Sequence, residues 1–197
     1  GTDVDSLIRG DSAVYMEFAL DRMFAEAPGI THVTLDISYN TGGNVGALYR
    51  VIGFITDQPF RTTRINAGTG SKGTSYIQIN NSEFRAGIKW SLLISNVTFS
   101  AGNNMATIFK ENNLGPVIGL TSGGGTSSIT PILLPNGSAF TMSSNSMNGM
   151  RIATGNPENP FEYVNNENGI TPDYAIEVLS LYNEATLLEI LNRHDLP

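Results

Sequence analysis

The sequence predicts an α/β fold in which strands alternate with helices in a single domain. An amphipathic helical pattern at 12–27 precedes a β-branched stretch at 30–38. The same order of elements returns when the strand-like run 90–97 leads into a helical pattern at 101–113. At 197 residues the chain is long enough for one sizeable core, so one domain spanning 1–197 is the expectation.

The first half of the chain contains two helices around a strand and a glycine turn. The apolar positions of the first helix are expected to be Val14, Phe18 and either Leu20 or Met23. Its N-cap is expected to be Asp11 or Ser12. A second helix follows the turn at 39–44, and its apolar face is formed by Val45, Leu48, Ile52 and Ile55. Short strands around a loop are expected at 61–80.

The second half continues the alternation and adds a hairpin. After the helix at 101–113, on which Met105, Ile108 and Phe109 are expected to face the core, a short buried strand is expected at 115–121. The glycine-rich stretch 121–128 is expected to be a flexible turn. The dipeptide Asn136-Gly137 predicts a hairpin turn within 129–144. We expect 145–171 to be irregular. The final helix is expected at 183–194, with Leu187, Leu188 and Leu191 on its apolar stripe.

Composition excludes several classes of function. The net charge of −7 leaves no basic surface for nucleic acid or anionic lipid. The absence of cysteine excludes disulfides, thiolate metal sites and a thiol nucleophile. No apolar run reaches the roughly 20 residues that a membrane-spanning helix needs. Neither a metal nor a cofactor is expected, and the sequence does not indicate an oligomeric state.

The stretch Thr98-Phe99-Ser100-Ala101-Gly102 separates an apolar strand from an amphipathic helix. A tight turn here leaves the Ser100 hydroxyl at the start of the helix, where backbone N–H groups lack partners within the helix. Such a position suits a nucleophilic serine, because an oxyanion formed beside it would meet those donors. The alternative is that Ser100 serves only as the helix N-cap.

Three further segments are weak signals when each is taken alone. Gly42-Gly43 follows a strand and precedes a helix, so bare backbone there can approach a ligand. The turn Gly123 to Gly125 follows a short strand, and Pro172-Asp173 leads into another. Taken one at a time, these segments also occur as ordinary tight connections.

In their order along the chain, these segments resemble peptidase family S41, which comprises the C-terminal processing proteases and the tricorn-like core domains. The resemblance covers about residues 12–180. It rests on five landmarks: Leu35-Asp36 through Asn40-Thr41-Gly42-Gly43, then Thr98-Phe99-Ser100-Ala101, then Val117-Ile118-Gly119 with Gly123 to Gly125, then Leu134-Pro135-Asn136-Gly137-Ser138, and finally Gly169-Ile170-Thr171-Pro172-Asp173. It implies a ClpP/crotonase-like fold of stacked β-strand and helix units.

The resemblance also implies roles for particular residues. Ser100 would be the nucleophile that forms an acyl-enzyme. The oxyanion hole would be formed by the N–H of Ala101 and that of Gly42 or Gly43. Asp36 and Asp173 are expected to be structural. The implied function is that of a serine endopeptidase acting on the C-termini of peptides or unfolded proteins, in an extracytoplasmic or cell-envelope location.

The general base departs from the family pattern. The processing proteases carry a lysine in the glycine-rich turn, where this chain has Gly124 or Gly125, and the three lysines lie elsewhere. The tricorn-like branch uses an upstream histidine with a later glutamate, for which Glu167 is the candidate. Neither His32 nor His194 matches the position of that histidine. A serine without a base stays protonated and is a weak nucleophile.

Several interpretations therefore stay open. The chain could be the C-terminal catalytic part of a longer protein, truncated on its N-terminal side, with the base on the preceding part. It could instead be an inactive homologue that binds peptides in the same groove by strand addition. A crotonase-like protein acting on acyl-CoA would share the fold, but the Thr98–Ala101 motif argues against that reading.

Overall fold

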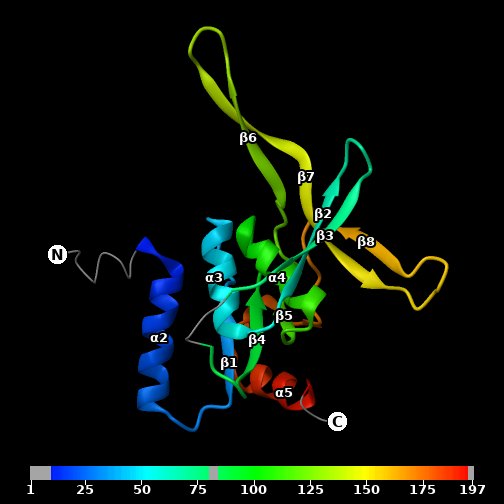
Figure 1. Cartoon of the computed structure of the whole chain (residues 1–197). Coiled ribbons are helices and arrows are strands. Elements are labelled where there is room, and N and C mark those ends of the chain that lie inside the picture. Colours follow the sequence, from blue (N-terminus) through cyan, green and yellow to red (C-terminus); the bar gives the residue numbers. More distant parts are fainter. Residues whose placement is uncertain (1–9, 80–83, 195–197) are drawn as a thin grey trace.

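The computed structural model describes residues 10–79 and 84–194, and its secondary structure forms two sheets joined by a central helix (Figure 1). The first sheet is parallel and has the strand order β1-β4-β5-β9. Its strands are β1 (His32–Asp36), β4 (Lys89–Ile94), β5 (Val117–Gly119) and β9 (Tyr174–Ala175). Leu35 lies opposite Leu92, which lies opposite Val117, so the centre of this sheet is apolar.

The second sheet is antiparallel and has the order β3-β2-β7-β6, with β8 also paired to β7. Its strands are β2 (Phe60–Asn66), β3 (Lys72–Ile77), β6 (Ser127–Leu133), β7 (Ala139–Ala153) and β8 (Phe161–Asn165). The long strand β7 organises this sheet, because β2, β6 and β8 all pair with it. Beyond the body of the protein, β6 and β7 continue alone as a projecting hairpin (Figure 1).

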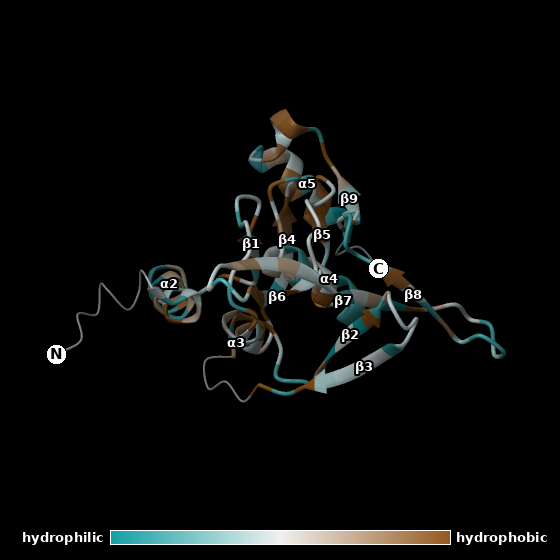
Figure 2. Ribbon diagram, turned by 90° about the horizontal axis from the view of Figure 1, so that it is seen from above, coloured by the Kyte–Doolittle hydropathy of each residue, from teal (hydrophilic) through white to brown (hydrophobic). Residues whose placement is uncertain are grey.

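Helices cover both faces of the parallel sheet (Figure 2). The helices are α2 (Ser12–Glu26), α3 (Val45–Ile55), α4 (Ala101–Asn112) and α5 (Glu184–His194), with a 3₁₀ turn at Val178–Ser180. Side chains alternate along β4, so Leu92 and Ile94 enter the cluster beneath α2, α3 and α4. Leu93 points the other way and packs with Ile190 of α5. The prediction of an α/β fold is confirmed.

Helix α4 connects the two sheets. It contacts β4 and β5 on one side and β2 and β7 on the other. Ile108 and Phe109 are fully enclosed, as the sequence predicts. At the far end of the helix, Asn112 accepts a hydrogen bond from the backbone N–H of Arg61 at 2.6 Å and donates one to its carbonyl at 3.0 Å. Because Ser100 directly precedes the first residue of α4, this anchoring helps to fix the position of that serine.

The apolar faces of the first and last helices agree with the prediction in part, since the expected Leu20 is buried. In α2 the buried residues are Ala13, Met16 and Leu20, whereas Phe18 is 50% exposed. In α5 the predicted Leu187 and Leu191 pack partly buried beside the buried Ile190, whereas the predicted Leu188 is 51% exposed. The N-cap of α2 is Asp11, not Ser12.

The expectation that 145–171 is irregular is wrong. Strand β7 continues to Ala153, and β8 occupies Phe161–Asn165. Asn, Gly and Ser are poor strand formers, but here β7 is fixed by neighbouring strands. Across the described residues, no helix combines the length and the apolarity needed to span a lipid bilayer.

Candidate active site

Ser100 lies in the turn between β4 and α4, and Thr98 ties this turn to the end of β1. The buried Thr98 hydroxyl donates to the carbonyl of Ile37 at 2.9 Å and accepts from the N–H of Ser95 at 3.0 Å. Ser100 itself has φ 54° and ψ −118°, a backbone conformation that non-glycine residues rarely adopt. The turn thus holds a strained serine at the carboxyl edge of the parallel sheet.

The side chain of Ser100 is half-buried and faces Gly42. A Cβ added to Gly42 would lie 2.5 Å from the Ser100 Cβ and 3.0 Å from its Oγ, so any larger residue would clash with the serine. Although Ser100 occupies the N-cap position of α4, its hydroxyl makes no capping hydrogen bond. The interpretation of Ser100 as only an N-cap is therefore not supported by its geometry.

The backbone N–H groups around Ser100 differ in their availability. The N–H of Gly42 donates to the side-chain oxygen of Asn40 at 2.9 Å. The carbonyl of Asn40 accepts from the N–H of Phe99 at 3.0 Å, which joins the two loops. Within 10–79 and 84–194, the N–H groups of Gly43 and Ala101 have no acceptor. Two donors therefore remain available at the loop that carries Ser100 and the loop beside it.

The glycine-rich turn forms a third side of the site. The N–H of Ser100 donates to the carbonyl of Gly124 at 2.8 Å, and the N–H of Gly123 donates to the carbonyl of Thr98 at 2.7 Å. The N–H of Gly125 donates to the carbonyl of Glu167, also at 2.8 Å. These bonds on both sides contradict the expectation of a flexible turn, because they hold its backbone between the serine turn and Glu167.

Neither Gly124 nor Gly125, the two positions at which the resemblance would place the lysine, has room for a side chain. A Cβ added to Gly124 would overlap the carbonyl of Glu167, and one added to Gly125 would overlap the ring of Phe99. Lys110 instead pairs with the carboxylate of Asp173 at 2.7 Å. Lys72 lies over the ring of Tyr163, 5.2 Å from its centroid. In the described part of the chain, Ser100 Oγ has no hydrogen-bond partner.

The carboxylate of Glu167 faces the start of β6. Its Oε2 accepts from the N–H of Ser127 at 2.8 Å and from the hydroxyl of Thr126 at 3.1 Å. The glutamate thus stands across the glycine turn from Ser100 and reaches the serine turn only through backbone bonds. Elsewhere, His32 lies 3.2 Å from the hydroxyl of Ser91, and His194 lies 3.1 Å from that of Tyr174.

The two aspartates of the landmarks hold the backbone in place. Asp36 accepts from the N–H of Ser38 at 2.9 Å and so shapes the end of β1. Asp173 accepts from the N–H of Val117 at 2.9 Å, while its other oxygen faces Lys110. Asp173 therefore joins β5, α4 and the segment before β9.

Sequence reasoning missed a buried amide cluster behind the site. Asn103 donates to the carbonyl of Asn166 at 3.1 Å, and Asn166 donates to the hydroxyl of Thr107 at 3.2 Å. The hydroxyl of Ser122 donates to Asn103 and accepts from the N–H of Ile170 at 2.7 Å. Buried amides of this kind are stable only when they are hydrogen-bonded. Two consecutive asparagines on the apolar side of a helix were the available signal.

An apolar cavity of about 390 Å³ adjoins the two available donors. Its walls come from α2, β1, α3 and the first turns of α4. The apolar residues that line it include Met16, Leu20, Met23, Val33, Leu35, Leu48, Val51, Trp90 and Met105, and it also borders Gly42, Gly43 and Ala101. A side chain bound next to the serine would therefore meet a mostly hydrocarbon surface.

The comparisons with known proteins decide the family. The model of Peptidase family S41 matches residues 11–176, which is most of the chain. The chain belongs to peptidase family S41. No curated protein sequence matches it.

Several solved structures share its fold. The photosystem II D1 C-terminal processing protease is 21% identical, with a TM-score of 0.64 over 84% of this chain and 39% of that one. Mature CPAF is 12% identical, with a TM-score of 0.62 over 92% of this chain and 48% of that one. A lipoprotein from Streptococcus agalactiae is 16% identical, with a TM-score of 0.60 over 97% of this chain and 63% of that one. The chain thus spans less than two thirds of the length of each of these proteins.

Most of the S41 landmarks converge in the structure. The segments that follow β1, β4 and β5 meet at one edge of the parallel sheet, and Gly169–Ile170 passes beside Ser122 of the glycine-rich turn. The remaining landmark, Leu134–Ser138, forms the hairpin turn at the far end of β6 and β7 (Figure 1). The S41 fold therefore assembles the candidate site from four landmarks and holds the fifth away from it.

Proposed function

We propose that this chain is the catalytic part of an S41 serine endopeptidase, with Ser100 as the nucleophile. The observation that carries the proposal is the strained backbone of Ser100 beside the two available N–H groups of Gly43 and Ala101. Strain of this kind persists where the surrounding structure enforces it, and it is frequent at catalytic positions.

The proposed reaction begins when Ser100 Oγ attacks the carbonyl carbon of a peptide bond and a base takes the hydroxyl proton. The oxyanion that forms would accept hydrogen bonds from the N–H groups of Gly43 and Ala101. Each such donor typically lowers the barrier by about 2.7–4 kcal/mol. The amine then leaves with a proton from the base, and water hydrolyses the acyl-enzyme. Gly42 is the less suitable donor of the glycine pair, because its N–H already bonds to Asn40.

The general base is proposed to lie outside the described residues. Steric overlap at Gly124 and Gly125 argues against a lysine in the glycine-rich turn. Glu167 is proposed to orient an incoming base, as the acidic member of a triad does. Its Oε2 is already held by Thr126 and Ser127, which would keep the carboxylate in place.

The substrate is proposed to be an extended or unfolded polypeptide, cut near its C-terminus. The cavity beside Gly43 and Ala101 favours an apolar side chain next to the cleaved bond, because burying such a side chain stabilises the complex by about 1.5–3 kcal/mol. An extracytoplasmic or cell-envelope location is also proposed, and the similarity to the streptococcal lipoprotein is in keeping with it.

The test compares this 197-residue chain, a longer protein in which it is joined to the segment proposed to carry the base, and the Ser100→Ala variant of each on a casein-like unfolded substrate. We expect very slow or no cleavage by the short chain, because no side chain of the described residues is hydrogen-bonded to Ser100 Oγ as a base would be. Cleavage by the longer protein, abolished by Ser100→Ala, would support the proposal. Brisk cleavage by the short chain that depends on Ser100 would place the base within these residues.

The second candidate is a peptide-binding module that does not cleave. The observation that favours it is the Ser100 hydroxyl without a hydrogen-bond partner among the described residues. The test measures binding of a fluorescent peptide with apolar residues by anisotropy. Binding by the longer protein, together with a complete lack of cleavage, would establish this candidate instead.

A further inference from the structure

The hairpin of β6 and β7 carries an open strand edge. On one side, β7 pairs with β6 from Ala139 onward. On its other side, β2 pairs with β7 only from Ser146 to Gly149, and the Asn145 carbonyl accepts from the N–H of Ala67. In the described structure, the segment Ala139 to Ser144 therefore has no neighbour on that side. Its backbone N–H and C=O groups form a template for another strand.

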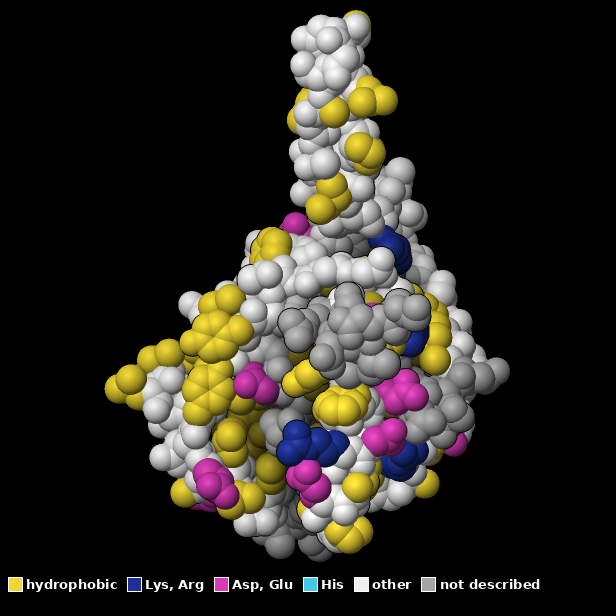
Figure 3. Space-filling model, turned by 90° about the vertical axis from the view of Figure 1, so that its left-hand side faces the viewer, with side chains coloured by type: hydrophobic (Ala, Val, Ile, Leu, Met, Phe, Trp, Pro, Cys, Tyr) yellow, Lys and Arg dark blue, Asp and Glu magenta, His cyan; other side chains and the backbone are white. Residues whose placement is uncertain are grey.

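The same hairpin is free of charge. From Ser122 to Met150 the chain has no Asp, Glu, Lys, Arg or His, although 15% of all residues are charged. In Figure 3 the hairpin stands out from the body with only white and yellow atoms, and the acidic and basic side chains begin at its base. Proteins usually protect an open edge with charges or proline. Pro131 protects the β6 edge in this way, but the β7 edge has no such residue.

Both faces of the hairpin expose apolar side chains. Phe140 and Met142 lie on one face and are 47% and 51% exposed. Ile129 and Leu133 lie on the other face and are 67% and 79% exposed. A two-stranded hairpin is only marginally stable in water without a third strand or a packing partner. A strand added to the β7 edge would supply that partner.

We propose that the segment Ala139 to Ser144 pairs with the same segment of a second copy of this chain. Two antiparallel edges related by a two-fold axis are self-complementary, so a single open edge forms a closed dimer with a continuous four-stranded ribbon. The proposal is independent of the proposed peptidase activity.

Charge restricts how a second copy can meet this one, and the uncharged hairpin is the part that avoids repulsion. Each chain carries a net charge of −7, so close approach of two bodies is repulsive. The seven residues of β6 give the hairpin a reach of roughly 20 Å, whereas charges are screened over about 8 Å at physiological salt. Pairing through two uncharged hairpins keeps the acidic bodies apart. A lipid bilayer is a less suitable partner for the hairpin, because the open β7 edge would place unpaired N–H and C=O groups in hydrocarbon.

Single cysteines provide a sharp test, because the chain has none of its own. In a two-fold antiparallel pair, the residue on the axis faces its own copy at about 4.5–5.5 Å between Cα atoms, within disulfide range. A residue one position away from the axis is displaced from its own copy by about 7 Å along the strand direction, in addition to the spacing between the strands. Cysteines placed singly at 139 to 144 should therefore give a sharp maximum of cross-linked dimer at Thr141 or Met142, the centre of the open edge.

Two controls accompany this scan. Thr130→Cys lies opposite Met142 on β6 and should not cross-link, and Asn136→Cys at the hairpin turn should not either. Maximal cross-linking at either control position, or equal yields along β7, would overturn the proposal.

The second measurement is sedimentation of the uncross-linked 197-residue chain over a range of concentrations. We expect a monomer–dimer equilibrium that Met142→Lys weakens at least about tenfold, because like charges meet across the new strand pair. The matched Thr130→Lys variant adds the same charge to the same face one strand further away, and it should dimerise as the parent does. A parent chain that stays monomeric up to about 1 mM, or that floats with phosphatidylcholine vesicles, would refute the dimer.

Discussion

Gly42 and Ser100 contact each other so closely that a Cβ on the glycine would lie 2.5 Å from the Cβ of the serine. The two residues are far apart in the sequence and follow different strands, β1 and β4. Because these strands are adjacent and parallel, their carboxyl ends place the glycine loop and the serine turn side by side. This contact is the geometric basis of the candidate active site.

Gly42→Ala is expected to destabilise the fold and displace Ser100. Gly42 has φ +112°, so alanine there is strained by about 1–3 kcal/mol before the clash with Ser100 is counted. Urea unfolding measures the loss. Gly43→Ala is the matched control, since Gly43 has φ +150° but no atom within 4 Å of its added Cβ. Equal losses in the two variants would show that contact with Ser100 contributes nothing.

Ser100→Gly and Ser100→Ala should differ in stability. The φ of 54° at Ser100 costs a non-glycine residue about 1–3 kcal/mol, which glycine avoids at an entropic cost of about 0.5–1 kcal/mol. Ser100→Gly should therefore unfold at a higher urea concentration than Ser100→Ala, by about 1 kcal/mol. Both substitutions remove the hydroxyl, so they act alike on any serine chemistry. If Ser100→Ala proves the more stable variant, the turn stores no such strain.

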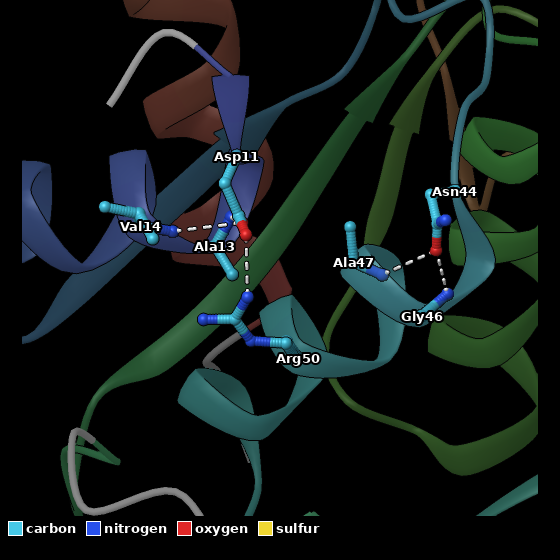
Figure 4. Close-up of polar contacts among 7 residues, drawn as sticks. All are labelled: Asp11, Ala13, Val14, Asn44, Gly46, Ala47 and Arg50. Carbon is cyan, nitrogen blue, oxygen red and sulfur yellow. Dashed lines mark hydrogen bonds and ion pairs between the residues drawn. The ribbon is translucent and has the colours of Figure 1, made fainter. Parts of the chain in front are cut away.

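The Asp11 carboxylate should contribute to stability at neutral pH and lose that contribution in acid. It caps α2 by accepting from the N–H groups of Ala13 at 2.9 Å and Val14 at 3.3 Å, and it pairs with Arg50 of α3 at 2.8 Å (Figure 4). The hydrogen bond from Ala13, with smaller contributions from Val14 and Arg50, holds the pKa of the Asp11 carboxyl below its ordinary value. A lowered folded pKa means that the stabilisation is complete above the ordinary pKa and is lost as the pH falls through the folded one.

Asp11→Ala is therefore expected to cost about 1 kcal/mol at pH 7, and the difference from the parent should shrink below about pH 4. Urea unfolding from pH 7 to pH 3 measures both. Arg50→Gln, which removes the partly exposed ion pair but keeps the cap, should cost less than about 1 kcal/mol. A difference between Asp11→Ala and the parent that does not vary with pH would contradict the role of the charged carboxylate.

Glu111 should be important for the joint between α4 and the antiparallel sheet. It is 4% exposed, and its Oε1 accepts from the Thr63 hydroxyl at 2.5 Å and from the N–H of Arg151 at 3.2 Å. Glu111→Ala removes the acceptor of the Arg151 N–H, which costs about 1–3 kcal/mol for an unpaired buried group, and leaves the Thr63 hydroxyl with only the Thr74 hydroxyl at 3.0 Å. Thermal unfolding should show a clear drop in melting temperature, whereas exposed Glu162→Ala should change it little. Similar melting temperatures for the two variants would mean that water replaces the lost carboxylate.

Local patterns in the sequence were sufficient to predict the order of elements up to the hairpin and the position of the serine turn, but not the strands within 145–171. The helix at 101–113, the strands on either side of it and the turn at Asn136-Gly137 depend on spacing and turn chemistry within a few residues. The candidate residues Ser100 and Ala101 could be found because strand, small-residue turn and helix are adjacent in the chain. The family followed from the order of five such segments.

Tertiary structure decided what local patterns leave open. Strand β7 has a polar sequence, and only pairing with β2, β6 and β8 makes it a strand. The burial of Asn103 against Asn166 and the position of Phe99 over Gly125 join segments far apart in the chain. The N–H of Gly42 is engaged by the side chain of Asn40, so the N–H of Gly43 is the one that remains free.

The sequence by itself determined the α/β order, the nucleophile candidate and the family, since these are local signals. Long-range pairing determined the site's geometry, its available donors and the open edge of the hairpin, because non-local contacts select among conformations that the local sequence allows equally.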